Sequence, residues 1–332
     1  MPLPLLFIGI GAAGAALGIG KGIKAGVDTK NANDTNKLAN NIVSNSIESL
    51  KTAQERSSFA IENLGKMKVN ILNTDMQNFI IAFEKLKNVD LSDSVELEEL
   101  KKFKLDKQAI SELKQMTHIA ADLTQGMAGG AAAGALTAFG AWGAASTFAA
   151  ASTGTAIASL SGAAATNATL AFFGGGALAA GGLGMAGGAV VLGGLIAGPA
   201  LAVAGIVLGA KAAKNKDNAY ANLAEARKYE AEYKTTRLAC NAIRRRAYMF
   251  YRLLIRIDAL FAPLIDTLNE IIASSGTDYS QYSEQQKYSV VAAATVAGTV
   301  KSILDTAILT EDGKLTEESE KIGKEVSQSL DK

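Results

Sequence analysis

The sequence predicts an all-α protein, an elongated bundle of long amphipathic helices around a glycine-rich hydrophobic helical block. Three observations support this class. Apolar residues recur three or four apart over two long stretches, one on each side of that block. Only four prolines occur in 332 residues, so long helices are permitted. No segment shows the period-two alternation that is typical of a half-buried strand.

The distribution of charge divides the chain. Its formal net charge of +1 favours no class of charged partner, and nucleic acid is not expected. The block from Leu123 to Ala210, however, holds 88 consecutive residues without Asp, Glu, Lys or Arg. We therefore distinguish a hydrophobic N-terminal segment, amphipathic helices, the charge-free block, a long amphipathic helix, and a C-terminal helix with an acidic tail: residues 1–26, 27–122, 123–210, 211–276 and 277–332.

The elements before the block are predicted from apolar spacing and capping residues. Residues 31–86 have one apolar stripe, which predicts a single long amphipathic helix. Residues 88–94 interrupt the pattern. Ser94 is placed to cap a second helix, with three glutamates in its first turn, that runs to about Leu123.

After the block, residues 211–272 predict a second long helix, bent near Pro263. A polar loop at 274–286 and a short apolar helix at 290–309 follow, and then a turn leads into a polar acidic tail. We expect the two long helices to pack antiparallel.

Glycine spacing indicates close helix packing in a membrane or an oligomer. Apolar segments lie near 126–150, 156–173 and 185–210, and the first and third reach the ~20 residues of a membrane-spanning helix. Glycine inside a helix costs about 1 kcal/mol relative to alanine, so glycines four residues apart need a packing reason. The candidate insertion or packing residues are Gly14, Gly18, Gly22, Gly26, Gly126, Gly130, Gly134, Trp142, Gly194, Gly198, Gly205 and Gly209.

The block is only moderately apolar. Ten residues of 186–208 are Leu, Ile or Val, which is worth a gross insertion energy of about −3 to −6 kcal/mol before glycine and Pro199 subtract from it. This favours conditional insertion as a packed group. Two alternatives remain: a buried Gly/Ala-rich core without a membrane role, and a permanent multi-span protein whose flanking lysines after residue 210 place that end in the cytoplasm.

Residues for enzyme chemistry are sparse, and we expect no enzyme. Residues 9–14 match a dinucleotide-binding glycine pattern, but the helical pattern after Asp28 does not fit the required βαβ unit. His118 is the only histidine and Cys240 the only cysteine, so a metal site would need carboxylates alone. We therefore expect no catalytic residue, no cofactor and no metal.

A basic cluster lies on the second long helix and at the end of the block. Arginines interleaved with aromatic residues indicate contact with lipid headgroups or with an acidic partner. The alternative is a solvated helix face paired with acidic residues of the first half of the chain. The candidate residues are Lys211, Lys214, Arg244, Arg245, Arg246 and Arg252, with Arg256 one turn further on.

The order of long helix, glycine-rich block and long helix over residues 30–275 resembles the helical pore-forming toxins of the cytolysin A and haemolysin BL type, and loosely the apolipoprotein L proteins. The string from Thr155 to Gly205, after an N-terminal glycine ladder, is similar to a block in a widespread group of uncharacterised bacterial proteins. Neither resemblance supplies catalytic residues. Secreted toxins carry an export signal, which is not recognisable here.

These observations predict a conditionally membrane-inserting, oligomerising protein that permeabilises or remodels a bilayer, for example as a toxin-like effector of bacterial defence. We expect it in the cytoplasm or at the bacterial inner membrane, without secretion by a classical signal. Its expected partners are a lipid bilayer, further copies of itself and, as a candidate trigger, a second protein. The alternative is a soluble scaffold homo-oligomer held together by the glycine-rich core.

Overall fold

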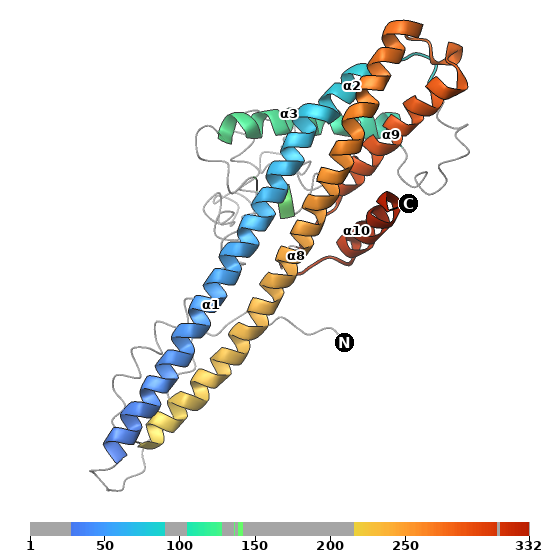
Figure 1. Cartoon of the computed structure of the whole chain (residues 1–332). Helices are drawn as coiled ribbons and strands as arrows, with labels where there is room; N and C mark the ends of the chain where they lie inside the picture. Colours follow the sequence, from blue (N-terminus) through green and yellow to red (C-terminus); the bar gives the residue numbers. More distant parts are fainter. Residues whose placement is uncertain are drawn as a thin grey trace. The chain divides into compact units, whose positions relative to one another are not determined.

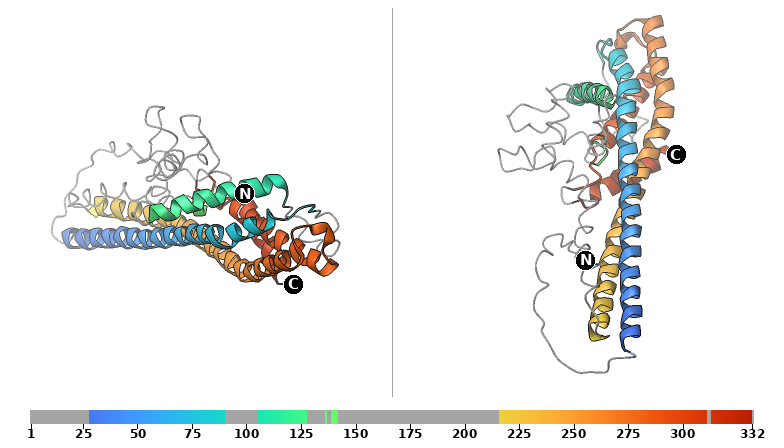
Figure 2. Two further views of the ribbon diagram at one scale, coloured as in Figure 1. Left: turned by 90° about the horizontal axis from the view of Figure 1, so that it is seen from above. Right: turned by 90° about the vertical axis from the view of Figure 1, so that its left-hand side faces the viewer.

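The computed structural model describes residues 28–89, 105–127, 136, 139–141, 216–310 and 313–331. This part of the chain is all-α, as predicted. It contains two isolated β-bridges and no β-strand. Figures 1 and 2 show its helices, which are α1 (Asp28–Ile71), the π-helix η1 (Leu72–Met76), α2 (Gln77–Phe83), α3 (Lys107–Met127), α8 (Lys216–Ser275), the 3₁₀-helix η6 (Tyr279–Gln281), α9 (Glu284–Asp305) and α10 (Glu317–Leu330).

The described residues belong to two compact units, and α1 and α8 contribute to both. The first unit contains residues 28–57 of α1 and 216–241 of α8. Asn222 of α8 donates a hydrogen bond of 3.1 Å to the side chain of Asn36 of α1. The buried cluster between them consists of Ala39, Val43, Leu50, Ala53, Ala226, Tyr233 and Cys240.

The second unit combines the end of α1, η1, α2 and α3 with the rest of α8, α9 and α10. Here the Phe79 and Phe261 rings lie 5.5 Å apart, and eight residues after Phe79 the amide of Lys87 donates to the carbonyl of Thr277 over 2.8 Å. Within this unit, α2 and α8 therefore run parallel, and the predicted antiparallel packing is wrong. Short loops force neighbouring helices to be antiparallel, whereas the long chain between α2 and α8 permits a parallel pair.

The first long helix is not uninterrupted. At Leu72–Met76 it becomes a π-helix, whose extra residue keeps both Leu72 and Met76 fully buried. Helix α3 crosses at this point (Figure 2), and Asn73 donates to the carbonyl of Ala120 over 3.1 Å and to the Thr124 hydroxyl over 2.6 Å. The π-helix thus allows the first long helix to pack against α3. The apolar periodicity of one segment does not predict this contact.

Helices α8 and α9 form a hairpin, in which the end of α8 lies close to the predicted 272, whereas α9 (Glu284–Asp305) begins six residues before its predicted start at 290. Helix α8 continues through Pro263 and ends at Ser275, and the following Gly276 has a φ of 78° that favours glycine. The side chain of Ser283 accepts a hydrogen bond from the amide of Gln286, and the Gln286 side chain accepts one from the Ser283 amide. This capping box sets the start of α9.

We expect Ser283→Ala to lower the free energy of unfolding by about 1 kcal/mol, because the Gln286 amide loses its capping oxygen. Urea unfolding of the full chain measures this loss. Ser283→Asp keeps an acceptor at the cap and should stay close to the wild type. A loss equal to that of Ser283→Ala would show that the cap does not act through its oxygen.

The acidic tail contains a helix that was not predicted. The side chain of Thr316 caps α10 by accepting from the Ser319 amide over 3.1 Å, and three glutamates stand in the first turn. The buried residues of the helix are Ser319, Gly323 and Val326, spaced as one helical face. Thr316 followed by glutamates was a sequence signal for this helix, but the low apolar content hid it.

Candidate functional site

Residues of the charge-free block lie buried against α1 in the second unit. Leu136 and Phe139 are each 2% exposed. A Cβ on Gly65 would overlap the carbonyl oxygen of Leu136 and lie 2.8 Å from its carbonyl carbon, and a Cβ on Gly140 would overlap the carbonyl oxygen of Ile61. The backbone of α1 and that of the charge-free block are therefore in direct contact, with one glycine on each side of the contact. We call this contact of Leu136 and residues 139–141 with α1 the docking site.

The docking site also contacts the segment that follows α9. The carbonyl of Ala141, which is 1% exposed, accepts hydrogen bonds from the amides of Ile308 over 2.7 Å and Leu309 over 3.1 Å. Main-chain bonds of this kind fix the path of the chain without depending on side-chain identity. The docking site thus clamps the block between α1 and the segment that follows α9.

A lysine lies at the centre of the docking site. Lys68 of α1 is fully buried, and its Nζ donates to the carbonyl of Phe139 over 3.4 Å and to that of Leu304 over 3.5 Å. It also lies 5.8 Å from the centroid of the Phe139 ring. Leu304 is in the last turn of α9, where carbonyls lack intrahelical partners. Lys68 therefore joins α1, α9 and the charge-free block through one amine.

The protonation of Lys68 is sensitive to its surroundings. Burial lowers the pKa of Lys68 from 10.5 to about 7, although the Asp305 carboxylate opposes this effect. The amine therefore exchanges its proton near neutral pH while docked. Any rearrangement that admits water to Lys68 restores its ordinary affinity for a proton, so protonation and undocking are linked.

An ion-pair network borders the docking site. The Nζ of Lys301 lies 2.7 Å from Glu112 of α3 and 2.5 Å from Asp305 at the end of α9. The hydrogen bond from Lys301 holds the pKa of Glu112 below its usual value. These groups line an open cleft of about 700 Å³ between α3, α9 and α10, in which carboxylates outnumber the two lysines. Most of its polar groups bond to one another, and the cleft indicates no particular ligand.

Carboxyl groups also meet where η1 contacts α8. Burial and a hydrogen bond with Asp258 raise the pKa of Asp75 to about 6, with the charges of Asp258 and Asp266 acting in the same direction. Among the described residues, one Asp258 oxygen is buried without a hydrogen-bond partner. The π-turn thus places Asp75 against like charge.

We expect Asp75→Asn to stabilise the protein at pH 7 but not at pH 4. The folded-state pKa of Asp75 is raised, so its contribution is present below pH 3.8 and is lost as pH rises through about 6. Urea unfolding at both pH values measures the difference. Asp34→Asn near the start of α1 provides an exposed control for the same change of side chain. Equal behaviour of the two variants would contradict the assigned repulsion.

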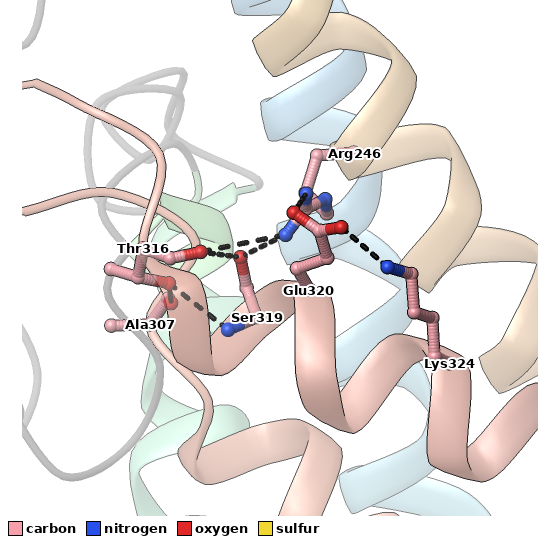
Figure 3. Close-up of polar contacts among 6 residues, drawn as sticks. All are labelled: Arg246, Ala307, Thr316, Ser319, Glu320 and Lys324. Atoms are coloured by element: carbon pink, nitrogen blue, oxygen red, sulfur yellow. Dashed lines mark hydrogen bonds and ion pairs between the residues drawn. The ribbon is translucent and has the colours of Figure 1, made fainter. Parts of the chain in front are cut away.

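A second cluster joins α8 to α10 (Figure 3). Arg246 donates to the Ser319 hydroxyl over 2.6 Å, to the Thr316 carbonyl over 3.5 Å and to Glu320 over 3.3 Å. The Thr316 hydroxyl donates to the carbonyl of Ala307, which ties the start of α10 to the segment after α9. Arg246 is thus part of the attachment of α10.

The far end of α10 has a matching contact. Arg256 of α8 donates to the carbonyl of Leu330 over 2.9 Å and to Asp331 over 2.8 Å. Between the two arginines, a Cβ on Gly323 would overlap the terminal methyl of Met249 and lie 3.1 Å from its sulfur. Exposed ion pairs contribute about 0–1 kcal/mol, and Val326 is the one buried large apolar residue of α10. The attachment of α10 is therefore specific but weak.

The predicted basic residues differ in their exposure and in their ion pairs. Arg244 is half-buried and Arg245 and Arg252 are exposed, and among the described residues no ion pair of these three is found. The alternative pairing with acidic residues in the first half of the chain is not observed for Arg246 or Arg256, which pair with α10. Lys211 and Lys214 lie outside the described residues.

Of the predicted packing residues, Gly126 lies in the last turn of α3. The others lie outside the described residues: Gly14, Gly18, Gly22, Gly26, Gly130, Gly134, Trp142, Gly194, Gly198, Gly205 and Gly209. The docking site uses Gly65, Gly140 and Lys68, which were not predicted. Lys68 follows buried Leu64 by four residues and precedes buried Leu72 by four, so its place on the apolar stripe was the available signal.

The remaining predicted groups are packed or solvated. His118 is exposed on α3, and Cys240 is buried in the first unit, where burial raises the pKa of its thiol. No three metal-ligating side chains converge within the described ranges. No helix in the described part of the chain has both the length and the apolar character needed to cross a bilayer. No protein-family model, curated protein or solved structure matches this chain.

Proposed function

We propose that this protein inserts conditionally into a lipid bilayer and there oligomerises to permeabilise or remodel it. The docking site is the observation that supports this function most directly. It holds residues of an 88-residue uncharged block against a charged helical bundle through backbone contacts, a buried lysine and two glycines. An apolar segment held in place by a lysine that titrates near neutral pH is suited to release on a signal.

The energetics favour a reversible arrangement. The most apolar part of the block, residues 186–208, gains only a few kcal/mol on insertion, about −3 to −6 before glycine subtracts. A docking contact of similar magnitude is enough to oppose this gain. Small shifts at the docking site then decide between a sheathed and an inserted block.

Flotation with liposomes tests this function. The purified full chain is mixed with anionic vesicles that carry a quenched dye, and flotation and dye release are scored in the same tube. We expect flotation with leakage, and we expect Gly130→Leu and Gly134→Leu to reduce leakage because small residues allow close packing in lipid. A chain that neither floats nor releases dye under any pH or vesicle composition would overturn the proposal.

A soluble scaffold homo-oligomer remains the second candidate, and one observation favours it. Leu136, Phe139 and Ala141 are buried in protein, as residues of an ordinary core would be. A scaffold should form oligomers of the same size with and without vesicles and stay at the bottom of the flotation gradient. Light scattering of the same sample measures the oligomer and separates the two functions.

We also propose that the protein acts from the cytoplasmic side on the bacterial inner membrane, with a second protein as the candidate trigger. The docking site supports a trigger, because an anchor made from α1, α9 and the block is altered by anything that moves one of the three. Flotation with inner-membrane vesicles, before and after addition of cell extract, tests this requirement.

A further inference from the structure

The surface of α8 beneath α10 has an unusual charge. From Tyr233 to Ile257 the chain contains no Asp or Glu, and the part within the second unit carries five arginines. Helix α10 and the residue after it carry five carboxylates, Glu317, Glu318, Glu320, Glu325 and Asp331, against two lysines. The two partners are therefore complementary in charge.

The contacts show that α10 neutralises part of this charge. Arg246 and Arg256 lie ten residues apart, nearly three turns of α8, and each donates to an acidic side chain at one end of α10. Met249 and Phe250 lie between them on the same side and contact the position of Gly323. Removal of α10 would leave two unpaired guanidinium groups flanking an apolar strip.

We propose that the α8 surface formed by Arg246, Met249, Phe250 and Arg256 binds an anionic lipid surface, and that α10 covers it as a displaceable helix. This inference rests on the proposed function and names the part of the protein that first meets the membrane. Arg245 and Arg252 are exposed and add positive charge nearby. An anionic bilayer fits this combination, because lipid phosphates take the arginines while the apolar strip enters the interface.

Two features make α10 displaceable. Its face toward the unit consists of Ser319, Gly323 and Val326, so little apolar surface holds it. Its ion pairs are partly open to solvent, with Glu320 and Asp331 side chains 53% and 62% exposed. Arg256, whose side chain is 44% exposed, is open to competition by a phosphate-rich surface, whereas Arg246, 14% exposed, becomes accessible once α10 lifts.

A reversible lock tests the inference. The Met249 sulfur lies 3.1 Å from the position of a Cβ on residue 323, so the side chains at 249 and 323 face each other, and loss of free thiol on oxidation verifies that cysteines at these positions form the disulfide. The test protein is the full chain with Cys240→Ser, Met249→Cys and Gly323→Cys. The oxidised and reduced forms of this protein are matched controls of identical composition.

Binding is measured to vesicles of phosphatidylglycerol and phosphatidylcholine in equal parts, and to phosphatidylcholine alone. We expect the oxidised form to bind the anionic vesicles roughly tenfold to thirtyfold more weakly than the reduced form, since two arginines stay covered. Binding to phosphatidylcholine should not change. Equal binding of the oxidised and reduced forms to anionic vesicles would overturn the inference.

A release variant gives the opposite change. Ser319→Arg places a second guanidinium against Arg246 at a fully buried position. Hydrogen exchange of the α10 amides verifies that the helix detaches. We expect tighter binding to anionic vesicles, an effect that salt weakens. A detached α10 without tighter vesicle binding would overturn the assignment to lipid, and capture of an acidic peptide instead would identify a protein partner.

Dye release separates this inference from the proposed function. If α10 controls vesicle binding but no variant ever releases dye, the α8 surface is assigned correctly and the insertion of the block is wrong. If dye is released equally by the oxidised and reduced forms, insertion stands and the role of α10 is wrong. The two proposals therefore fail on different readouts.

Discussion

Gly65→Ala is expected to destabilise the second unit by about 2–4 kcal/mol, although alanine is the better helix former. Within a helix, alanine is favoured over glycine by about 1 kcal/mol, so a position without steric constraint would gain stability. At Gly65 the new methyl would overlap the Leu136 carbonyl, and its neighbours are backbone atoms that cannot rotate away. The sign of the change therefore reports whether the block is docked.

Urea unfolding and hydrogen exchange of the full chain measure this effect. Gly140→Ala should behave alike, because its methyl would overlap the Ile61 carbonyl. Gly323→Ala is the matched control, since its methyl meets the flexible end of Met249, which can move aside, and its effect should stay within about 1 kcal/mol of the wild type. A gain in stability for Gly65→Ala would contradict the docking site.

The same substitution has a consequence for the proposed function. A docking site weakened by Gly65→Ala should release the charge-free block more readily, so dye release should begin at lower protein concentration or milder pH than in the wild type. Unchanged dye release from a destabilised variant would separate the stability of the bundle from the control of insertion.

The sequence predicted the helical class and most helix positions because periodicity is a local signal. The apolar stripe of residues 31–86 depends only on neighbours within a few turns. The parallel direction of α2 and α8 depends on contacts such as Phe79 with Phe261, and no local pattern encodes them. The helix within the acidic tail was missed because its apolar face consists mainly of small residues.

For the candidate site, the sequence predicted the types of residue involved but not the residues that come into contact. The absence of charge between Leu123 and Ala210 distinguishes the block, and its glycines were the predicted contact residues. The glycine that meets the block, however, lies on α1, in a segment that otherwise reads as an amphipathic helix. Arg246 was predicted to contact lipid headgroups or an acidic partner, whereas its contact within the chain is Glu320, 74 residues away. Contacts at such separations follow from the fold.

Lys68→Met is expected to stabilise the second unit near pH 7.5 and to abolish most of its pH dependence above pH 7. Burial lowers the folded-state pKa of Lys68 to about 7, while a state with this amine in water keeps the ordinary value of 10.5. Between these values the open state binds the proton and the docked state does not. The docked state therefore gains stability as pH rises, by up to about 1.4 kcal/mol per pH unit, and shows no further change from Lys68 below pH 7.

Methionine removes this cost but also removes two hydrogen bonds. The carbonyls of Phe139 and Leu304 would lose donors that lie at 3.4 and 3.5 Å, near the limit for a hydrogen bond. Losing such long bonds costs about 1 kcal/mol each at most, less than the roughly 4 kcal/mol of deprotonating a lysine three pH units below its ordinary pKa. We therefore expect a net gain at pH 7.5 that shrinks toward zero and reverses by pH 10.5.

Urea unfolding between pH 6.5 and 10.5 distinguishes the sources of this dependence. Asp305, whose charge acts on Lys68, and the groups that Lys301 joins to it, Lys301 and Glu112, remain in both proteins, so the difference between wild type and variant reports on Lys68. Lys66→Met is the matched control, because Lys66 is exposed on the same helix and forms an ion pair with Glu62 in the preceding turn. If Lys68→Met keeps the wild-type slope, Lys68 is already charged when docked and the coupling between its proton and the release of the block is wrong.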